Sequence, residues 1–273
     1  MTYEAFLYKI RGKKYSDILL DLITIGIKAK DEVLKYYHDG FKVETKSDKS
    51  PVTSADLASN KIICEYLKNK YPSYAILSEE STDDLKRLEN DRVFIIDPID
   101  GTADFVDKDD EFSINLAFAV KGEIKVGVII IPALNYCYFS YGHNPSYFYD
   151  LNENLIKVIH VSEKTDNLTV LTSRKHEVDL NVIKPIKHLV KDIKPCGSSY
   201  KGCLIAQGDA DMYFNHSQNT KEWDVAPIDI IVTNAGGVFL TLNKMEKFIY
   251  NKKDPYNRDG FLCMNRSDYY IKK

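Results

Sequence analysis

The stretch FIIDPIDGTADF, residues 94–105, places two carboxylates directly after a run of apolar residues. In a straight strand the side chains of Asp97 and Asp100 would lie about 10 Å apart and point to opposite faces. Pro98 removes an amide donor and disfavours helix at the residue before it. Gly101 allows the backbone to approach a ligand closely. We therefore expect the chain to turn here and to bring both carboxylates to one point.

Two ionised carboxylates a few ångströms apart repel each other, and one of them takes up a proton unless a cation lies between them. We expect magnesium, because it takes oxygen ligands and completes its shell with water and substrate phosphate. Other acids stand where they could join such a site: Glu79 and Glu80 end the segment AILSEE, Asp56 lies on the first turn of a predicted helix, and Asp224 follows Trp223. Taken singly, each is explained equally well as a capping residue or a solvated turn.

Hydrophobic periodicity indicates which elements position these acids in the N-terminal half. Apolar residues spaced by three and four predict an amphipathic helix over 16–37, which ends near Asp39-Gly40. A capping box formed by Thr53 and Asp56 predicts a second helix that runs to about Lys70. Strands are expected at 74–80, 92–97, 111–120, 123–131 and 136–141, the last three as an antiparallel meander.

The pattern changes after residue 150. A strand is expected at 167–173, a helix at 177–191, and a final helix from Asp224 to Asn234 that stops at Gly236-Gly237. We therefore predict an α/β (α+β) protein of layered sheets and helices, with an N-terminal lobe over 1–150 and a C-terminal lobe over 151–273.

The composition excludes several classes of protein. A chain of 273 residues with 44% hydrophobic and 28% charged residues is typical of an ordinary soluble globular protein, and its net charge of −3 gives no basic footprint for nucleic acid. The N-terminus lacks a signal-peptide core, and no window approaches 18 uncharged apolar residues, so no membrane span is expected. The five cysteines form no CxxC pair, which favours reduced thiols and a cytoplasmic location.

Four segments together resemble one family: PVTSADLASN, ILSEE, DPIDGT and EWDVAPIDIIVTNAGG. In order and spacing they are similar to the inositol monophosphatase superfamily of magnesium-dependent, lithium-sensitive phosphatases, and within it to the bacterial 3'(2'),5'-bisphosphate nucleotidases. The resemblance implies a layered αβαβα sandwich. It also implies hydrolysis of the 3'-phosphate of adenosine 3',5'-bisphosphate to AMP and phosphate by metal-activated water.

The resemblance further implies roles for individual residues. Two to three magnesium ions would be held by Glu79, Asp97, the carbonyl of Ile99, Asp100 and Asp224. Glu79, Asp56 and Thr102 would act in catalysis, the last two by orienting the attacking water. The phosphate would meet the amides of Gly101 and Thr102. The rest of the substrate would contact Ser173, His176, Gly197, Ser198, Ser199, Lys201 and Asp224.

The chain departs from the bacterial nucleotidases at Ala103-Asp104, at Ala226-Pro227 and in the segment NHSQNTKEWD. These departures concern the substrate rather than the metal ligands. Two alternatives therefore stay open: a phosphatase of the same mechanism acting on inositol monophosphates, and a metal-binding regulatory protein with little catalysis. In each case the expected partner is a small phosphate ester, bound by a monomer or a homodimer.

Overall fold

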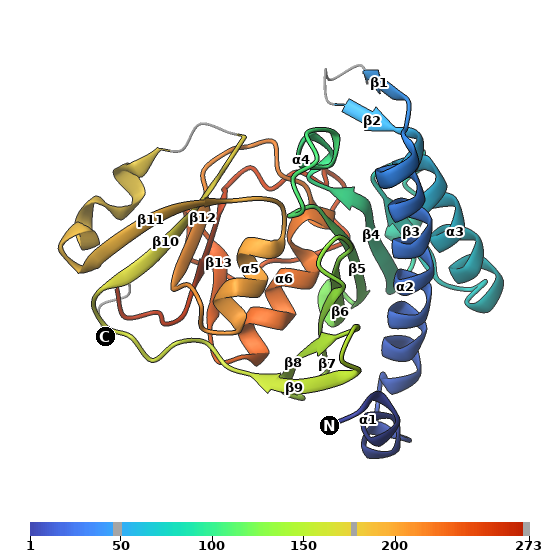
Figure 1. Ribbon diagram of the computed structural model, residues 1–273, viewed down its shortest axis with the longest axis horizontal. Coiled ribbons are helices and arrows are strands. Elements are labelled where there is room, and N and C mark those ends of the chain that lie inside the picture. Colours follow the sequence, from blue (N-terminus) through green and yellow to red (C-terminus); the bar gives the residue numbers. More distant parts are fainter. Residues whose placement is uncertain (46–50, 176–178, 270–273) are drawn as a thin grey trace.

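The structure is a computed structural model and describes residues 1–45, 51–175 and 179–269 (Figure 1). The α-helices are α1 (Tyr3–Ile10), α2 (Ser16–Asp39), α3 (Ser54–Lys70), α4 (Thr102–Val106), α5 (Tyr200–Ala206) and α6 (Glu222–Asn234). Two 3₁₀ helices are η1 (Lys86–Glu89) and η2 (Leu180–Leu189). None of the helices within these ranges is both long and apolar enough to cross a membrane.

Two sheets form the body of the molecule. The seven-stranded sheet runs in sequence order through β3 (Ala75–Ser78), β4 (Arg92–Asp100), β5 (Ser113–Val120), β6 (Glu123–Ile131), β7 (Tyr136–Tyr141), β8 (Ser146–Asp150) and β9 (Leu155–Ile159). The five-stranded sheet has the order β11 (Val190–Cys196), β10 (Leu168–Ser173), β12 (Met212–Asn215), β14 (Phe261–Met264) and β13 (Val238–Thr241). A separate hairpin pairs β1 (Val43–Thr45) with β2 (Pro51–Thr53).

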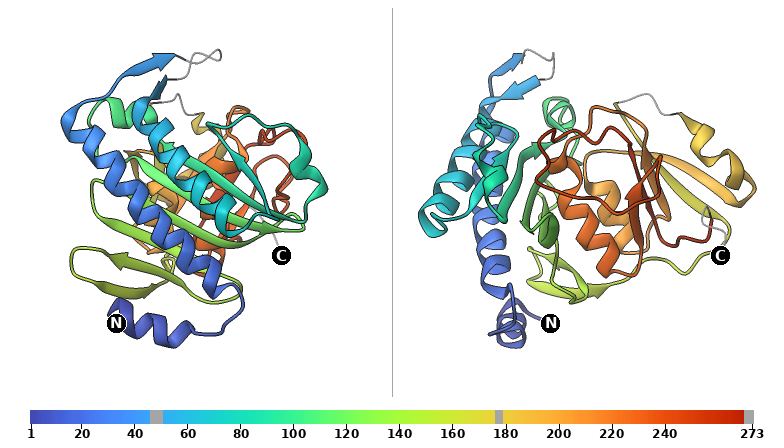
Figure 2. Two further views of the ribbon diagram at one scale, coloured as in Figure 1. Left: turned by 90° about the vertical axis from the view of Figure 1, so that its right-hand side faces the viewer. Right: turned by 180° about the vertical axis from the view of Figure 1, so that it is seen from behind.

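The helices cover both faces of the larger sheet. Helices α2 and α3 lie across one face, as Figure 2 shows, and α5 and α6 fill the space between the two sheets (Figure 1). Strand β4 is buried on both sides, because Phe94 and Ile96 pack with the outer helices whereas Val93 and Ile95 pack with α6. Helix η2 covers the far face of the smaller sheet through Ile183 and Ile186. This arrangement confirms the predicted layered αβαβα sandwich.

The helix expected over 177–191 is wrong in its type and in its C-terminal end. Its described part is the 3₁₀ helix η2, followed directly by strand β11. Ile183 and Ile186 are buried three residues apart, which is the repeat of a 3₁₀ helix, and Pro185 lies between them. Strand β11 is an exposed edge strand with little apolar alternation, so the sequence gives a weak strand signal there.

The other predicted elements of the N-terminal half are confirmed. Helix α2 extends two residues beyond the expected 16–37, and the meander forms as β5, β6 and β7. The expected lobe boundary at residue 150 falls at the end of β8, and β9 continues the same sheet. The main consequence for function is that β3, β4, α5 and α6 all reach one cavity.

Candidate active site

A β-bulge brings Asp97 and Asp100 to the same side of strand β4. Asp97 pairs with Asn115 of β5 and Asp100 pairs with Ser113, so three steps along β4 oppose two along β5. Residues three apart on a regular strand point to opposite faces, and the extra residue of a bulge reverses that relation. The expected turn therefore takes the form of a bulge, and the chain stays in the sheet.

Neighbouring elements add two more acids to this corner. Strand β3 runs parallel to β4 with Ser78 opposite Ile96, and the amide of Glu79 donates to the carbonyl of Ile96 at 3.2 Å. Asp224 comes from the first turn of α6, where its Oδ2 accepts from the amide of Lys221 at 2.8 Å in a capping box. The capping explanation of Asp224 is thus correct, and the same side chain also reaches Asp97 and Asp100. We call the cluster of Glu79, Asp97, Asp100 and Asp224 the acid corner.

Three carboxylates meet closely enough to share a cation. One carboxylate oxygen from each of Asp97, Asp100 and Asp224 lies within 4.8 Å of the other two. Asp97 is 1% exposed, and its Oδ1 accepts from the amide of Ile99 at 3.2 Å. The structure thus brings together three aspartates that the sequence grouped, from segments more than 120 residues apart.

Hydrogen bonds fix one oxygen of Asp100 and leave the other available. Its Oδ2 accepts from the amide and the hydroxyl of Ser199, both at 2.6 Å. Ser113 and Asn115 lie at 3.4 Å from the same oxygen. Among the described residues no hydrogen bond is made to Oδ1, so this oxygen is free to bind a ligand.

The electrostatics of the cluster call for a cation. Burial raises the pKa of Asp97 well above its ordinary value, and the charges of Glu79, Asp100 and Asp224 raise it further. Burial also raises the pKa of Asp224, with Asp100 and Glu79 adding to the effect. The ammonium of Lys221 lies 3.8 Å from the carboxylate of Glu79. A set of hard oxygen donors with this excess of negative charge fits magnesium.

Asp56 caps α3 and also contacts Thr102. It is 1% exposed, and its Oδ2 accepts from the amide and hydroxyl of Thr53 at 2.8 and 2.5 Å, which completes the capping box of α3. Its other oxygen accepts from the hydroxyl of Thr102 at 3.1 Å. Thr102 lies at the start of α4, so this hydrogen bond joins two distant helix ends at the acid corner.

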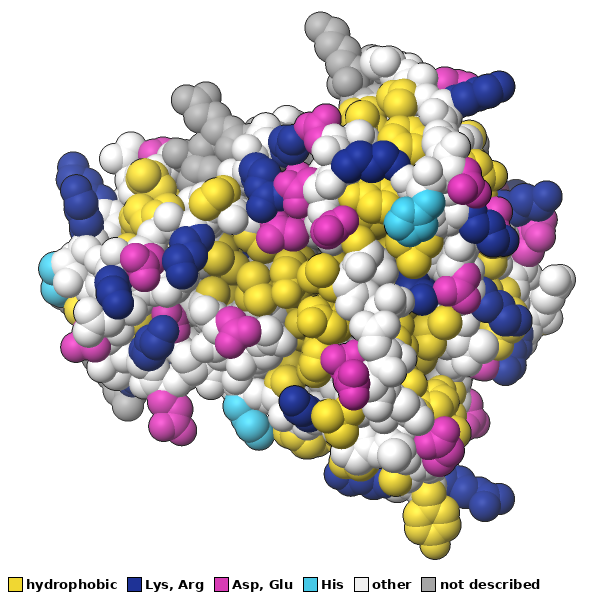
Figure 3. Space-filling model, in the orientation of Figure 1, with side chains coloured by type: hydrophobic (Ala, Val, Ile, Leu, Met, Phe, Trp, Pro, Cys, Tyr) yellow, Lys and Arg dark blue, Asp and Glu magenta, His cyan; other side chains and the backbone are white. Residues whose placement is uncertain are grey.

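The acid corner opens into a cavity of about 620 Å³ between the two sheets. Of the predicted site residues, the cavity lining includes Glu79, Asp97, Ile99, Asp100, Gly101, Thr102, Ser173, Ser198, Ser199, Lys201 and Asp224. Acidic and basic side chains gather on the outer face around α4, above a broad apolar area (Figure 3). In that region Arg174 forms ion pairs with Asp109 and Glu111, and Lys175 forms one with Asp107.

Among the described residues of the predicted site, Asp56 and Gly197 do not line the cavity. The amide of Gly197 donates to Glu111 Oε2 at 2.7 Å. A Cβ atom there would lie 2.9 Å from the Cβ of Glu111, so glycine is required for this close packing. His176 lies outside the described residues.

Lys201 is a buried lysine on the cavity wall. It is 3% exposed, its ammonium donates to the carbonyl of Cys196 at 3.1 Å, and it lies 4.9 Å from the ring centroid of Tyr213. Burial lowers its pKa. An ammonium in this position favours an anionic group of the ligand.

Several residues of the site were not anticipated. Lys175, Tyr213, Asn215, Lys221 and Tyr256 also line the cavity. Outside the cavity lining, Asn115 donates from Nδ2 to the hydroxyl of Ser199 at 2.8 Å and to the carbonyl of Trp223 at 3.3 Å. The signal for Asn115 was available, because it is the one amide side chain in the apolar run SINLAFAV.

Comparison with known proteins identifies the family. The model of the inositol monophosphatase family matches residues 16–267. This chain belongs to the inositol monophosphatase family. It is therefore a phosphatase of a family that is in general magnesium-dependent, and the resemblance inferred from DPIDGT and EWD is confirmed.

Relatives within the family carry different names. The chain is 28% identical over 255 residues to the 3'(2'),5'-bisphosphate nucleotidase CysQ of Aggregatibacter actinomycetemcomitans, covering 92% of this chain and 94% of that one. It is 31% identical over 232 residues to the Nus factor SuhB of Pasteurella multocida, covering 81% and 84%. The crystal structure of CysQ from Bacteroides thetaiotaomicron, a bacterial member of the family, superposes with a TM-score of 0.79 at 27% identity over 93% and 99% of the two chains.

Proposed function

We propose that this protein hydrolyses the 3'-phosphate of adenosine 3',5'-bisphosphate to give AMP and phosphate, with magnesium as cofactor. The observation that carries the proposal is the meeting of Asp97, Asp100 and Asp224 in one cavity that also contains the buried cation Lys201. The CysQ relatives, named as 3'(2'),5'-bisphosphate nucleotidases, support the choice of substrate.

The metal ligands in this proposal are Glu79, Asp97, the carbonyl of Ile99, Asp100 and Asp224, which together hold two to three ions. Magnesium bound there would polarise the phosphate ester and lower the pKa of water. Asp97, which is buried, would serve as a ligand to more than one ion, and Oδ1 of Asp100 would be available as a further ligand. Positive charge at this point would offset the repulsion that raises the pKa values of Asp97 and Asp224.

Thr102 and Asp56 orient the attacking water. The Thr102 hydroxyl donates its proton to Asp56 and also lies 3.3 Å from the carbonyl of Ile99. A hydroxyl that donates to a buried carboxylate presents its lone pairs in a fixed direction, so it can accept a hydrogen bond from one water molecule. The amides of Gly101 and Thr102 are proposed to bind the phosphate.

Lys201 and the serines of the 198–199 turn bind the part of the substrate that is not hydrolysed. The ammonium of Lys201 favours a second anionic group, which adenosine 3',5'-bisphosphate has and inositol monophosphate lacks. Ser199 is held by Asp100 and Asn115, so its position depends on the acid corner. Ser173, at the end of β10, lies on the cavity wall and would contact the same part of the substrate. We also propose that lithium inhibits the enzyme.

Phosphate release from a small substrate panel tests the proposal. We expect turnover of adenosine 3',5'-bisphosphate with magnesium, loss of turnover in excess EDTA, and a kcat/KM at least about tenfold lower for inositol 1-phosphate. Equal or greater turnover of inositol 1-phosphate would favour the second candidate, an inositol monophosphatase, the activity after which the family is named. No phosphate release from any substrate would favour a binding or regulatory role.

A further inference from the structure

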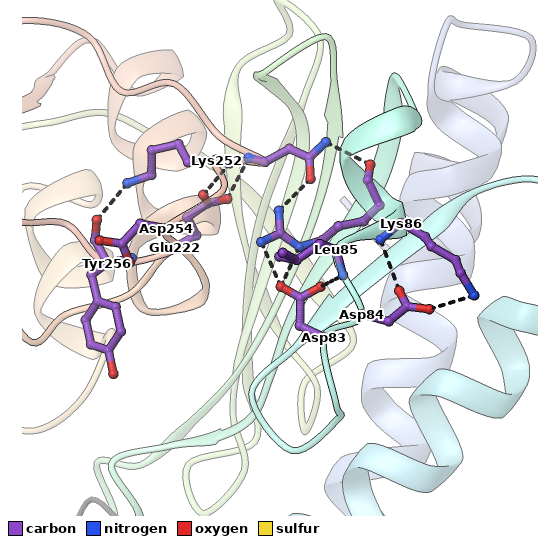
Figure 4. Close-up of polar contacts among 10 residues, drawn as sticks. Asp83, Asp84, Leu85, Lys86, Glu222, Lys252, Asp254 and Tyr256 are labelled. Atoms are coloured by element: carbon purple, nitrogen blue, oxygen red, sulfur yellow. Dashed lines mark hydrogen bonds and ion pairs between the residues drawn. The ribbon is translucent and has the colours of Figure 1, made fainter.

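A chain of buried polar contacts joins the loop after Glu79 to the start of the helix that holds Asp224. Its members are Arg87 in η1, Asn251 in the segment before β14, and Glu222 at the first position of α6. We call these three side chains the 87–251–222 strut. Figure 4 shows these polar contacts, with Glu222 on one side of them and Asp83 on the other.

Glu222 anchors the strut to α6. Its side chain is fully buried, and its two oxygens accept from the backbone amides of Asn251 at 2.6 Å and Lys252 at 2.8 Å. The Glu222 amide in turn donates to the carbonyl of Pro255 at 2.9 Å. Both ends of this residue therefore hold the 251–255 segment against the N-terminus of α6.

Asn251 connects that segment to the loop between β3 and β4. Its Oδ1 accepts from Arg87 Nη1 at 2.8 Å, and its Nδ2 donates to the carbonyls of Arg87 and Asn90 at 3.1 and 3.3 Å. Arg87 is 3% exposed and is held by two hydrogen bonds to Asp83 Oδ2, at 3.0 and 2.8 Å. The hydrogen bonds of the Asn251 side chain thus join residues more than 160 positions apart in the chain.

The strut closes a ring whose other side is the active site. Glu79 begins the loop that Arg87 anchors, and Asp224 lies two residues after Glu222. Lys221, just before Glu222, reaches Glu79 across the cavity at 3.8 Å. Both acids are therefore attached to elements that the strut ties together.

From this geometry we infer that Glu222 and Asn251 are positioning residues that set the separation of Glu79 and Asp224 for metal binding. The inference rests on the metal role proposed above. Neither side chain is among the residues that line the described cavity, so an effect on metal affinity would act through Glu79 and Asp224. A merely structural tie would instead change stability and leave the metal affinity of the folded protein unchanged.

The test measures Mn²⁺ binding by isothermal titration calorimetry, without substrate, on the full chain and two variants. Asn251 has φ +61°, a conformation that favours glycine, so Asn251→Gly removes the side chain without backbone strain. Glu222→Gln places an amide group against backbone donors. We expect the dissociation constant for Mn²⁺ to rise about tenfold or more in each variant.

Asp211→Asn is the matched control. Asp211 is also fully buried and accepts from a backbone amide, that of Thr169 at 2.7 Å, but its partners Ser162 and Thr169 belong neither to the loop after Glu79 nor to α6. We expect this variant to lose stability and to bind Mn²⁺ as the wild type does. If Glu222→Gln fails to fold, Asn251→Gly alone decides.

The outcomes separate the inference from the proposed function. Unchanged Mn²⁺ affinity in Asn251→Gly, with wild-type binding intact, overturns the positioning role and leaves the metal site standing. No Mn²⁺ binding by the wild type overturns both. As a second readout, raising magnesium should restore the kcat of Asn251→Gly to within about twofold of wild type, because the variant is weakened only in metal affinity.

Discussion

Removing the charge of Asp97 should separate stability from catalysis. Asp97→Asn keeps the shape of the side chain and the oxygen that accepts from the Ile99 amide. One carboxylate oxygen from each of Asp97, Asp100 and Asp224 lies within 4.8 Å of the other two. Two unit charges at that separation repel by about 3 kcal/mol at an effective dielectric constant of 20. Asp97 faces both Asp100 and Asp224 at this range. Proton uptake by the wild type relieves part of the repulsion, so we expect a net gain of roughly 1–3 kcal/mol in the metal-free variant.

The assay is thermal unfolding at pH 8 in EDTA and again in magnesium, with phosphate release measured in parallel. In EDTA the Tm of Asp97→Asn should exceed that of the wild type by on the order of 5 °C. Magnesium should raise the wild-type Tm and have little effect on the variant, since a ligand stabilises only the state that binds it. Turnover should fall at least about 10³-fold.

A matched control and two outcomes decide this prediction. Asp166→Asn removes one charge from an exposed side chain outside the cavity and should change neither Tm nor turnover. A variant Asp97→Asn that is less stable than wild type in EDTA would refute the claim of repulsion. A variant that magnesium stabilises as much as the wild type would refute the role of Asp97 as a ligand.

Three further predictions concern single side chains. Thr102→Val should lower kcat by about 10²-fold with little change in KM. Thr102→Ser should keep most of the activity, because only the hydroxyl oriented by Asp56 is needed. Equal losses of kcat in the two variants would contradict this role. Lys201→Met should raise the KM for adenosine 3',5'-bisphosphate by about tenfold or more and leave the KM for inositol 1-phosphate unchanged, because only the bisphosphate has a second anion for the ammonium. An equal rise in KM for both substrates would argue against this role. Burial raises the pKa of Asp229 to about 6, so the folded state binds its proton more tightly than the unfolded state, and this group's contribution to stability falls as pH rises from about 4 to 6. Asp229→Asn should therefore be more stable than wild type at pH 8, by up to about 3 kcal/mol, and similar to it at pH 4, as measured by urea unfolding. A variant less stable at pH 8 would show that the hydrogen bond from Tyr250 matters more than the charge.

The sequence was most informative where a local rule and a tertiary role coincide. The capping box of Thr53 and Asp56 is a local pattern, and it places Asp56 at the buried end of α3 where Thr102 can reach it. The sequence around Asp97 and Asp100 indicated a break in strand geometry, but a bulge of one residue depends on pairing with β5 and cannot be distinguished from a turn in the sequence alone.

The sequence was least informative where the partner is distant and the local pattern is weak. Strand β11 lies at a sheet edge with most of its side chains exposed, and its stability comes from parallel pairing with β10. The strut residues Arg87, Asn251 and Glu222 show no common motif, because each is separated from its partner by at least 29 positions. Their arrangement follows from the packing of the two sheets around α6.

Diffraction from crystals grown with Mn²⁺, recorded at a wavelength where manganese scatters anomalously, tests the central claim most directly. We expect at least two anomalous peaks in the acid corner, one bound by Asp97, Asp100 and Asp224 and another bound by Glu79 and Asp97. An acid corner without metal, or Asp224 directed away from Asp97 and Asp100 in the crystal, would contradict it.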